Sequence, residues 1–470
     1  MILNSKILGS QQRVVNCTLL QSIITEVDHH HHTSQPSHKS TIQLRNSLRM
    51  ICDRSDEDAD DFEYMKELTL VHDDDDDIEC MVLPCLLLRS HHRSSALFRK
   101  RWDSDYLLNL AVTEGSFLAE YRVDPRGFDI LHELLDSTIN RTGRFSAVSM
   151  ATSGSSEITP ASRLGAALIM LSGGRRIESM RTHGLSMSTV YDNFHRVISA
   201  INSHPALEIS CDNSMNGLMS RSQDFMERSS FDIFKYCTGA VDGLAISIRC
   251  PSRAEVQNQA RFFSGSKKKY CLNMQGVCDS RCRFIAVTCK HVGSTNDAVA
   301  FSQCSLKNLC EAQVFPYHWN GDNAYTSSES MMIPFPGTNL SVTHPTREWF
   351  NFWHSQVRIT IERTFGIFIQ RWGIFWQPLR FNLKNCVAIV HACCRLHNFC
   401  INRNLPVLSS HHITASIALI DPNGRLADDT WRSNTQPTEE WAQINTGNTL
   451  RDELVNTIGR NNYAHERNYK

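Results

Sequence analysis

The sequence has no long hydrophobic run. Its longest apolar stretch, residues 81–88, contains a proline and is too short to cross a bilayer. The first fifteen residues lack the apolar core of a secretory signal. The 17 cysteines are odd in number and scattered, without the spacing of a disulfide framework. We therefore expect a soluble intracellular chain with reduced cysteines and no membrane segment.

The sequence also has almost no net charge, at −1 over 470 residues. Residues 51–90 alone carry −11, which leaves +10 on the rest of the chain. Because blocks of like charge such as Asp73–Asp77 stay solvated, we predict a disordered acidic region over 1–95. The His29–His32 run lacks structured ligand spacing, so a chance tract is favoured over a metal site. A basic folded part favours a polyanionic partner.

Residues 96–205 have the pattern of a helical domain. Within it, residues 160–201 predict a helix, a short helix, a turn at Gly184 and a third helix, which is the outline of a helix-turn-helix unit. Plain three-helix packing explains this spacing equally well. We predict a linker over 206–235 and a mostly flexible tail over 403–470, with a short amphipathic helix at 449–458.

Residues 236–402 change to an α/β pattern. We predict strands over 236–250, 270–277, 283–289 and 312–319, and helices over 295–309, 350–372 and 385–400. Three acids stand out: Asp242 inside the first strand, where aspartate is disfavoured, Asp322 just after the fourth strand, and Glu362 beside the apolar stripe of its helix. Taken alone, the Glu362 helix is better explained by an ordinary surface ion pair with Arg358.

Folding alone can bring these three carboxylates together, because 80 and 40 residues separate them. Like charges in one pocket raise each other's pKa, and divalent cations remove that conflict. Oxygen ligands suit Mg²⁺ or Mn²⁺. Two such ions about 4 Å apart can support phosphodiester cleavage.

Five sequence motifs occur in order with these acids: GAVDGLAISI around Asp242, GSTNDAVAF around Asp297, GDNAY around Asp322, FNFWHSQVRITIERTFGIFIQRW around Glu362, and CCRLHNF at the end. Through them residues 238–402 resemble the DDE transposases of the PIF/Harbinger group and the transposase-derived nucleases related to them. The resemblance implies an RNase H-like core after the helical domain, with Asp242, Asp322 and Glu362 as ligands of two divalent ions. Asp297 is expected to cap a helix or support the site, with direct ligation as the less favoured alternative.

The resemblance also implies a DNA substrate, action in the nucleus, a separate Myb-like DNA-binding partner and a homo-oligomeric active form. Ala324 stands where this family usually has glycine, and Ile369-Gln370 replaces a Leu-Lys pair. The missing lysine leaves DNA contact at that place to Arg371. The candidate DNA contacts are Arg358, Arg371, Lys267, Lys268 and Lys269.

Other groupings have simpler explanations. A zinc site of Cys278, Cys282, Cys289 and His291 is less favoured than buried strand cysteines. A hairpin bearing Arg281 and Arg283 is either a solvated edge or a phosphate-tracking surface. We therefore weigh a metal-dependent DNA nuclease or transposase against a non-cutting, domesticated DNA-binding protein and against a scaffold that acts only through protein partners.

Overall fold

The computed structural model describes residues 101–140, 157–227, 232–337, 340–406 and 449–461. All of them belong to one compact unit that begins at Ser94. The predicted disordered region with its His29–His32 and Asp73–Asp77 runs lies outside these residues, as does most of the C-terminal tail. The predicted helix at 449–458 is confirmed as α19 (Thr449–Arg460).

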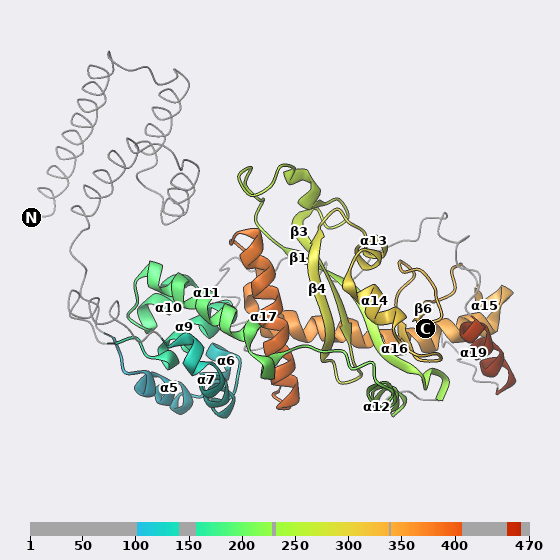
Figure 1. The fold of residues 1–470 in the computed structure, drawn as a ribbon, viewed down its shortest axis with the longest axis horizontal. Helices are drawn as coiled ribbons and strands as arrows, with labels where there is room; N and C mark the ends of the chain where they lie inside the picture. The colour runs from blue at the N-terminus through green and yellow to red at the C-terminus, as the bar shows by residue number, and fades with distance from the viewer. Residues whose placement is uncertain (1–100, 141–156, 228–231, 338–339, 407–448, 462–470) are drawn as a thin grey trace, which may run out of the picture. The chain divides into compact units, whose positions relative to one another are not determined.

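The first described part is helical, as the sequence pattern predicts (Figure 1). Its helices are α5 (Ser104–Thr113), α6 (Phe117–Tyr121), α7 (Pro125–Ile139), α9 (Pro160–Leu171), α10 (Arg176–Thr182) and α11 (Met187–Ser203). Side chains of Asp124, Thr159 and Ser186 accept hydrogen bonds from backbone N–H groups in the first turns of α7, α9 and α11. These caps satisfy amides that would otherwise lack a partner at each helix start.

Helices α9, α10 and α11 reproduce the helix-turn-helix outline. However, α11 packs against α17 (Leu383–Asn402) as well as against α9. The exposed side chains of α11 are Ser188, Asp192, Ser199 and Ser203, and Arg196 is half-buried. DNA reading by this unit stays a prediction.

A mixed sheet forms the centre of the second part. Its strands are β1 (Cys237–Ser247), β2 (Phe263–Ser264), β3 (Lys269–Cys278), β4 (Phe284–Val292), β5 (His318–Asn320) and β6 (Met331–Met332). They follow the order β2-β3-β1-β5-β6, with β4 paired to β3. β1 runs antiparallel to β3 and parallel to β5. The predicted fold class, an RNase H-like mixed sheet flanked by helices, is confirmed.

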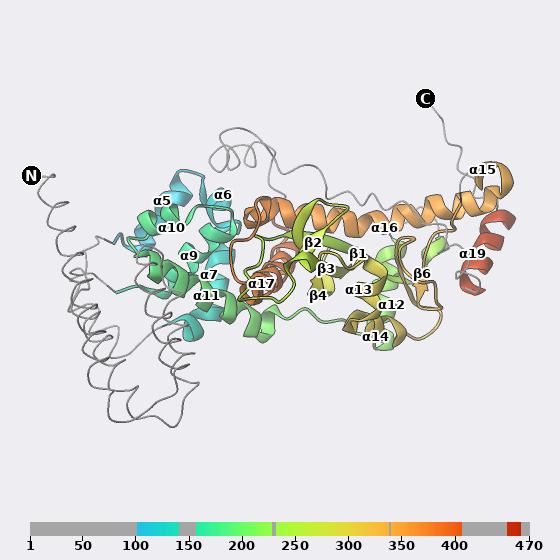
Figure 2. The ribbon, with the colours of Figure 1, turned by 90° about the horizontal axis from the view of Figure 1, so that it is seen from above.

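Helices cover both faces of this sheet (Figure 2). The long helix α16 (Pro345–Arg371) lies on one side, and α13 (Asp297–Ser302) and α14 (Ser305–Glu311) lie on the other. The predicted helix over 295–309 is thus two helices. The predicted strand over 312–319 is wrong in its extent, since only its last residues enter β5. The predicted linker contains α12 (Met215–Met226), which packs against β1. A further short helix, α15 (Leu340–Thr343), precedes α16.

The apolar stripe predicted on α16 is buried throughout. Val357, Ile361, Phe365, Phe368 and Trp372 are each at most 6% exposed. Four of these residues, all except Val357, belong to the core shared by the sheet, α17 and the N-terminal helices. Burying five large apolar side chains fixes the rotation of α16, and this rotation sets the direction in which Arg358 and Glu362 point.

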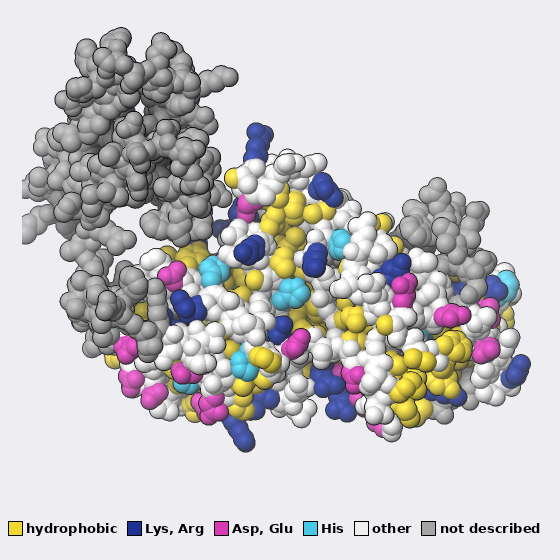
Figure 3. Space-filling view, in the orientation of Figure 1, with side chains coloured by type: hydrophobic (Ala, Val, Ile, Leu, Met, Phe, Trp, Pro, Cys, Tyr) yellow, Lys and Arg dark blue, Asp and Glu magenta, His cyan; other side chains and the backbone are white. Residues whose placement is uncertain are grey.

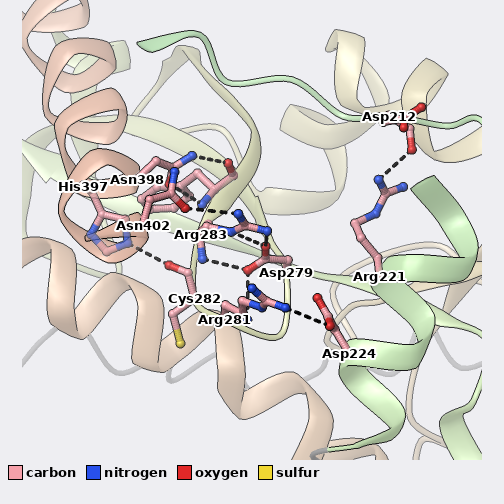
Figure 4. A network of polar contacts seen from close by, with 11 residues as sticks. Asp212, Arg221, Asp224, Asp279, Arg281, Cys282, Arg283, His397, Asn398 and Asn402 are labelled. Carbon is pink, nitrogen blue, oxygen red and sulfur yellow. Dashed lines mark hydrogen bonds and ion pairs between the residues drawn. The ribbon is translucent and has the colours of Figure 1, made fainter. Parts of the chain in front are cut away.

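Helix α17 holds the β3–β4 hairpin by side chains of the CCRLHNF motif (Figure 4). His397 Nε2 donates to the backbone oxygen of Cys282 at 2.8 Å. The Asn398 amide makes two bonds with the backbone of Phe284, at 2.7 and 2.8 Å. The two residues therefore have a structural role.

The two arginines of this hairpin are paired with acids rather than left open to phosphate (Figure 4). Arg283 forms a 2.7 Å ion pair with Asp279. Arg281 reaches Asp224 on α12 at 3.2 Å. Their charges are largely compensated, which disfavours the phosphate-tracking alternative for this hairpin.

Candidate active site

Strand pairing brings Asp242 and Asp322 together. Ala240 on β1 is the partner of Asn320 on β5, and the two strands are parallel, so residues two positions further along each chain are neighbours. Asp242 is 4% exposed and Asp322 is 8% exposed. Both carboxylates thus lie buried at the end of β5.

Helix α16 brings Glu362 to the same place through Arg358. The Arg358 guanidinium pairs with Glu362 Oε1 at 2.6 Å and lies 3.6 Å from Asp242 Oδ2. The Glu362 side chain is 32% exposed, whereas that of Asp242 is 5% exposed. The structure therefore gathers the three predicted acids around one arginine, with Glu362 as the member open to solvent.

Backbone amides orient the two aspartates. Gly243 N donates to Asp242 Oδ1 at 2.7 Å, and Ala324 N donates to Asp322 Oδ1 at 2.9 Å. Only the N–H of Ala324 is used, so alanine in place of the usual glycine leaves this hydrogen bond intact. Each aspartate keeps its second oxygen for another partner.

Burial and repulsion by neighbouring carboxylates raise the pKa of both aspartates. Burial raises the pKa of Asp242 well above its ordinary value, and the neighbouring Asp322 raises it further. Burial raises the pKa of Asp322 to about 6, against the opposing effect of the Ala324 N–H bond. The single positive charge of Arg358 does not compensate these acids, so the site favours further positive charge.

Asp297 supports the site from behind the sheet. Its Oδ1 accepts hydrogen bonds from Asn273 Nδ2 at 2.9 Å and from Gln275 Nε2 at 2.7 Å. It also lies against Gly243, where an added Cβ would clash with the carboxylate. Successive strand residues face opposite sides, so Asp242 and Gly243 present opposite faces. This placement supports the predicted supporting role of Asp297 rather than ligation.

Sequence reasoning missed the residues that complete this support. Tyr325 donates from its hydroxyl to Gln275 Oε1 at 2.7 Å, which fixes the amide that holds Asp297. Tyr325 belongs to the GDNAY motif, and Asn273 and Gln275 alternate around Met274 on a buried strand. Polar residues at alternate positions of a buried strand could have indicated these supporting residues in the sequence.

The structure contradicts the proposed DNA contact by Arg371. This side chain is 2% exposed. It donates to backbone oxygens of Arg122 at 2.9 Å and of Pro406 at 2.8 Å. The predicted DNA contact is therefore wrong. Arg371 instead links α16 to the chain segments that precede α7 and follow α17.

Lys267, Lys268 and Lys269 lie at the tip of a β-ribbon. β2 pairs with the start of β3, so Gly265–Lys268 form the connecting turn, and Lys268 has a φ of 51° there. The carboxyl end of β1 reaches this part of β3 through the Ser247–Cys271 pair. On the face seen in Figure 3, lysine and arginine side chains are dispersed rather than joined in one continuous patch.

No group of three or more His, Cys, Asp or Glu residues in the described ranges is arranged to hold a metal ion as it stands. The zinc alternative thus lacks support there, and burial raises the pKa of the Cys278 and Cys289 thiols. For the three acids, the guanidinium of Arg358 lies against two of the carboxylates. Their hard oxygen donors and excess negative charge nevertheless fit Mg²⁺ or Mn²⁺.

One known family matches the part of the chain that contains the three acids. Residues 241–398 match the family described as DDE superfamily endonuclease, a range that includes all three acids. The resemblance stated from the motifs is thereby confirmed. No solved structure has a significant match to the chain.

Among the described helices, none has the length and apolar character needed to cross a membrane.

Curated relatives carry the name "Putative nuclease HARBI1". The Bos taurus and Homo sapiens proteins are each 27% identical over 177 residues, which is 37% of this chain and 48% of each relative. The Xenopus laevis protein is 24% identical over 340 residues, or 71% of this chain and 90% of its own length. The chain therefore spans about half the length of the first two relatives.

Proposed function

We propose, from the match of residues 241–398 to the family described as DDE superfamily endonuclease, that the chain cleaves DNA phosphodiester bonds with two divalent metal ions. Asp242, Asp322 and Glu362 would hold the ions. The observation that carries the proposal is the convergence of these three acids, from two strands and one helix, around a single arginine.

The residues of the chain have distinct tasks in this proposal. The N–H groups of Gly243 and Ala324 each bind the Oδ1 atom of one aspartate, which would leave the two Oδ2 atoms to hold the ions. Glu362, the most exposed of the acids, would meet the ion nearest the substrate. The bound ions would activate a water or a 3′-hydroxyl and stabilise the leaving oxygen.

DNA would extend from the acids toward the lysine turn. Asp242 pairs with Gly276 on β3, and the lysines lie at the other end of that strand. At about 3.3 Å per residue this is about 23 Å, roughly two-thirds of a turn of duplex. The +10 charge outside residues 51–90 supports a polyanionic substrate. In this proposal the protein acts in the nucleus as a homo-oligomer, with a Myb-like partner that selects the site.

The alternative is a domesticated DNA-binding protein that does not cut. It would keep the fold and the basic ribbon without turnover. The three intact acids favour the nuclease, because a binder has no need for uncompensated buried carboxylates.

A nicking assay on supercoiled plasmid tests the proposal. The full chain is incubated with Mg²⁺ or Mn²⁺ and compared with Glu362→Gln, which keeps the side-chain shape and removes one ligand charge. Glu311→Gln, at an exposed glutamate of α14, is the matched control. We expect metal-dependent nicking by the wild type and the control and none by Glu362→Gln. Equal nicking by all three would refute the assignment, and binding without nicking by any would select the non-cutting alternative.

A further inference from the structure

Arg358 occupies the centre of the acidic site. Its Nη2 lies 2.6 Å from Glu362 Oε1, and its Nη1 lies 3.6 Å from Asp242 Oδ2. These oxygens come from two of the three acids proposed as metal ligands. A guanidinium and a divalent cation cannot both take the same lone pairs, so the two positive groups compete for them.

The two ends of the guanidinium are held unequally. The contact with Glu362 is within hydrogen-bond distance, whereas Nη1 is buried and makes no hydrogen bond. The contact with Asp242 is thus a charge contact without the directional bond of a well-matched Arg–carboxylate fork. An unbonded buried donor is costly, so this arrangement is easily given up for a better one.

The Arg358 side chain lies at the more open end of the site. It is 18% exposed and that of Glu362 is 32% exposed, whereas that of Asp242 is only 5% exposed. A DNA phosphate at this opening offers two oxygens in the geometry that a guanidinium prefers. No other basic residue is paired with Asp242, Asp322 or Glu362 among the described ion pairs.

We propose that Arg358 is a built-in counter-ion of the metal-free site, which a divalent cation must displace and which then becomes available to a DNA phosphate. This inference rests on the proposed function, since it concerns metal loading of the same acids. It assigns Arg358 a positioning role that opposes metal binding while DNA is absent. A nuclease built in this way loads metal weakly until a substrate phosphate receives the displaced arginine.

The test is Mn²⁺ binding by the full chain without DNA, followed by calorimetry or electron paramagnetic resonance. Arg358→Gln removes the competing charge, and we expect it to bind Mn²⁺ about tenfold more tightly than the wild type. Arg363→Gln, at an exposed arginine of the same helix, should bind like the wild type. Asp322→Asn should lose this binding and so separates it from any other Mn²⁺ bound by the chain.

A second variant keeps the test informative if Arg358→Gln does not fold. Arg358→Lys keeps a positive charge, but an ammonium has no planar fork to span two carboxylates, so we expect a smaller tightening of about threefold. Mn²⁺ affinity that is unchanged or weaker in both Arg358 variants, yet lost in Asp322→Asn, would overturn the counter-ion role and leave the metal site standing. No Mn²⁺ binding that depends on Asp322 in any variant would overturn the proposed metal site itself.

Discussion

Arg371 donates a 2.9 Å hydrogen bond from Nη1 to the backbone oxygen of Arg122, 249 residues earlier in the chain. Its Nη2 bonds the oxygens of Leu405 and Pro406 at 3.4 and 2.8 Å. One buried guanidinium thereby joins the N-terminal helices, α16 and the end of α17. The α/β part and the helical part preceding it share one core.

Replacing Arg371 should destabilise the protein without a specific effect on DNA. Arg371→Gln leaves buried carbonyls without donors, at about 1–3 kcal/mol each, so we expect a loss of about 3 kcal/mol in the free energy of unfolding. Urea denaturation measures it, with the exposed Arg363→Gln as control, expected within about 0.5 kcal/mol of wild type. Weaker DNA binding at unchanged stability would instead restore Arg371 as a DNA contact.

Gly366→Ala should stabilise α16. An added Cβ at this position meets nothing within 4 Å, and glycine inside a helix costs about 1 kcal/mol relative to alanine. We expect the free energy of unfolding to rise by about 1 kcal/mol. Gly366 lies one turn after Glu362, so reduced plasmid nicking by the stabilised variant would locate the substrate at this helix face. A lower free energy of unfolding would contradict the finding that an added Cβ at Gly366 meets no other atom.

Asp322→Asn should stabilise the metal-free protein at neutral pH. Its pKa is raised from 3.8 to about 6 in the folded state. Between these values the folded protein binds more protons than the unfolded chain, so stability falls as pH rises through this window and stays low above it. Removing the charge should recover up to about 3 kcal/mol at pH 7.5.

The same substitution should have little effect at pH 4, where the carboxyl is protonated in the fold. Asparagine keeps an oxygen for the N–H of Ala324, so the loop geometry is retained. Thermal unfolding at both pH values, with the exposed Asp129→Asn as control, measures the difference. Equal effects of Asp322→Asn on stability at pH 4 and pH 7.5 would mean that burial does not raise the pKa of this carboxyl.

Replacing Lys267, Lys268 and Lys269 with glutamine should weaken DNA binding at all sequences alike. If each lysine neutralises one phosphate, the slope of log K against log salt concentration falls by up to about 2.7 for duplex DNA. Titrations of labelled duplex at several salt concentrations measure the slope. An unchanged slope at unchanged stability would remove the ribbon from the DNA path.

The three candidate acids could be singled out from the sequence because strand and helix patterns agree there with the ordered motifs around them. Asp242 interrupts an apolar strand, and Glu362 lies beside a stripe of five apolar residues whose burial fixes the helix rotation. Both signals are local. The helix caps at Ser186 and Asn296 were equally accessible, because a capping side chain acts on the amides that follow it.

The remaining features depend on contacts that sequence spacing does not encode. Arg371 and Arg363 are both arginines on one helix, and only the packing of distant segments buries the first and exposes the second. The role of Gln275 depends on the register of β1 and β3, which places it beside Gly243 and within reach of Asp297. The helix α12 in the predicted linker has a polar composition that hid its packing against β1.

The central claim is that three distant segments form one divalent-metal site, and iron-mediated backbone cleavage tests it most directly. Fe²⁺ replaces Mg²⁺ in the full chain, and ascorbate with peroxide generates hydroxyl radicals that cut only near the bound ion. We predict cuts close to Asp242, Asp322 and Glu362 together, suppressed by excess Mg²⁺ and lost in Asp322→Asn. Cuts confined to other segments, or cuts at the three acids that persist in Asp322→Asn, would contradict the shared site.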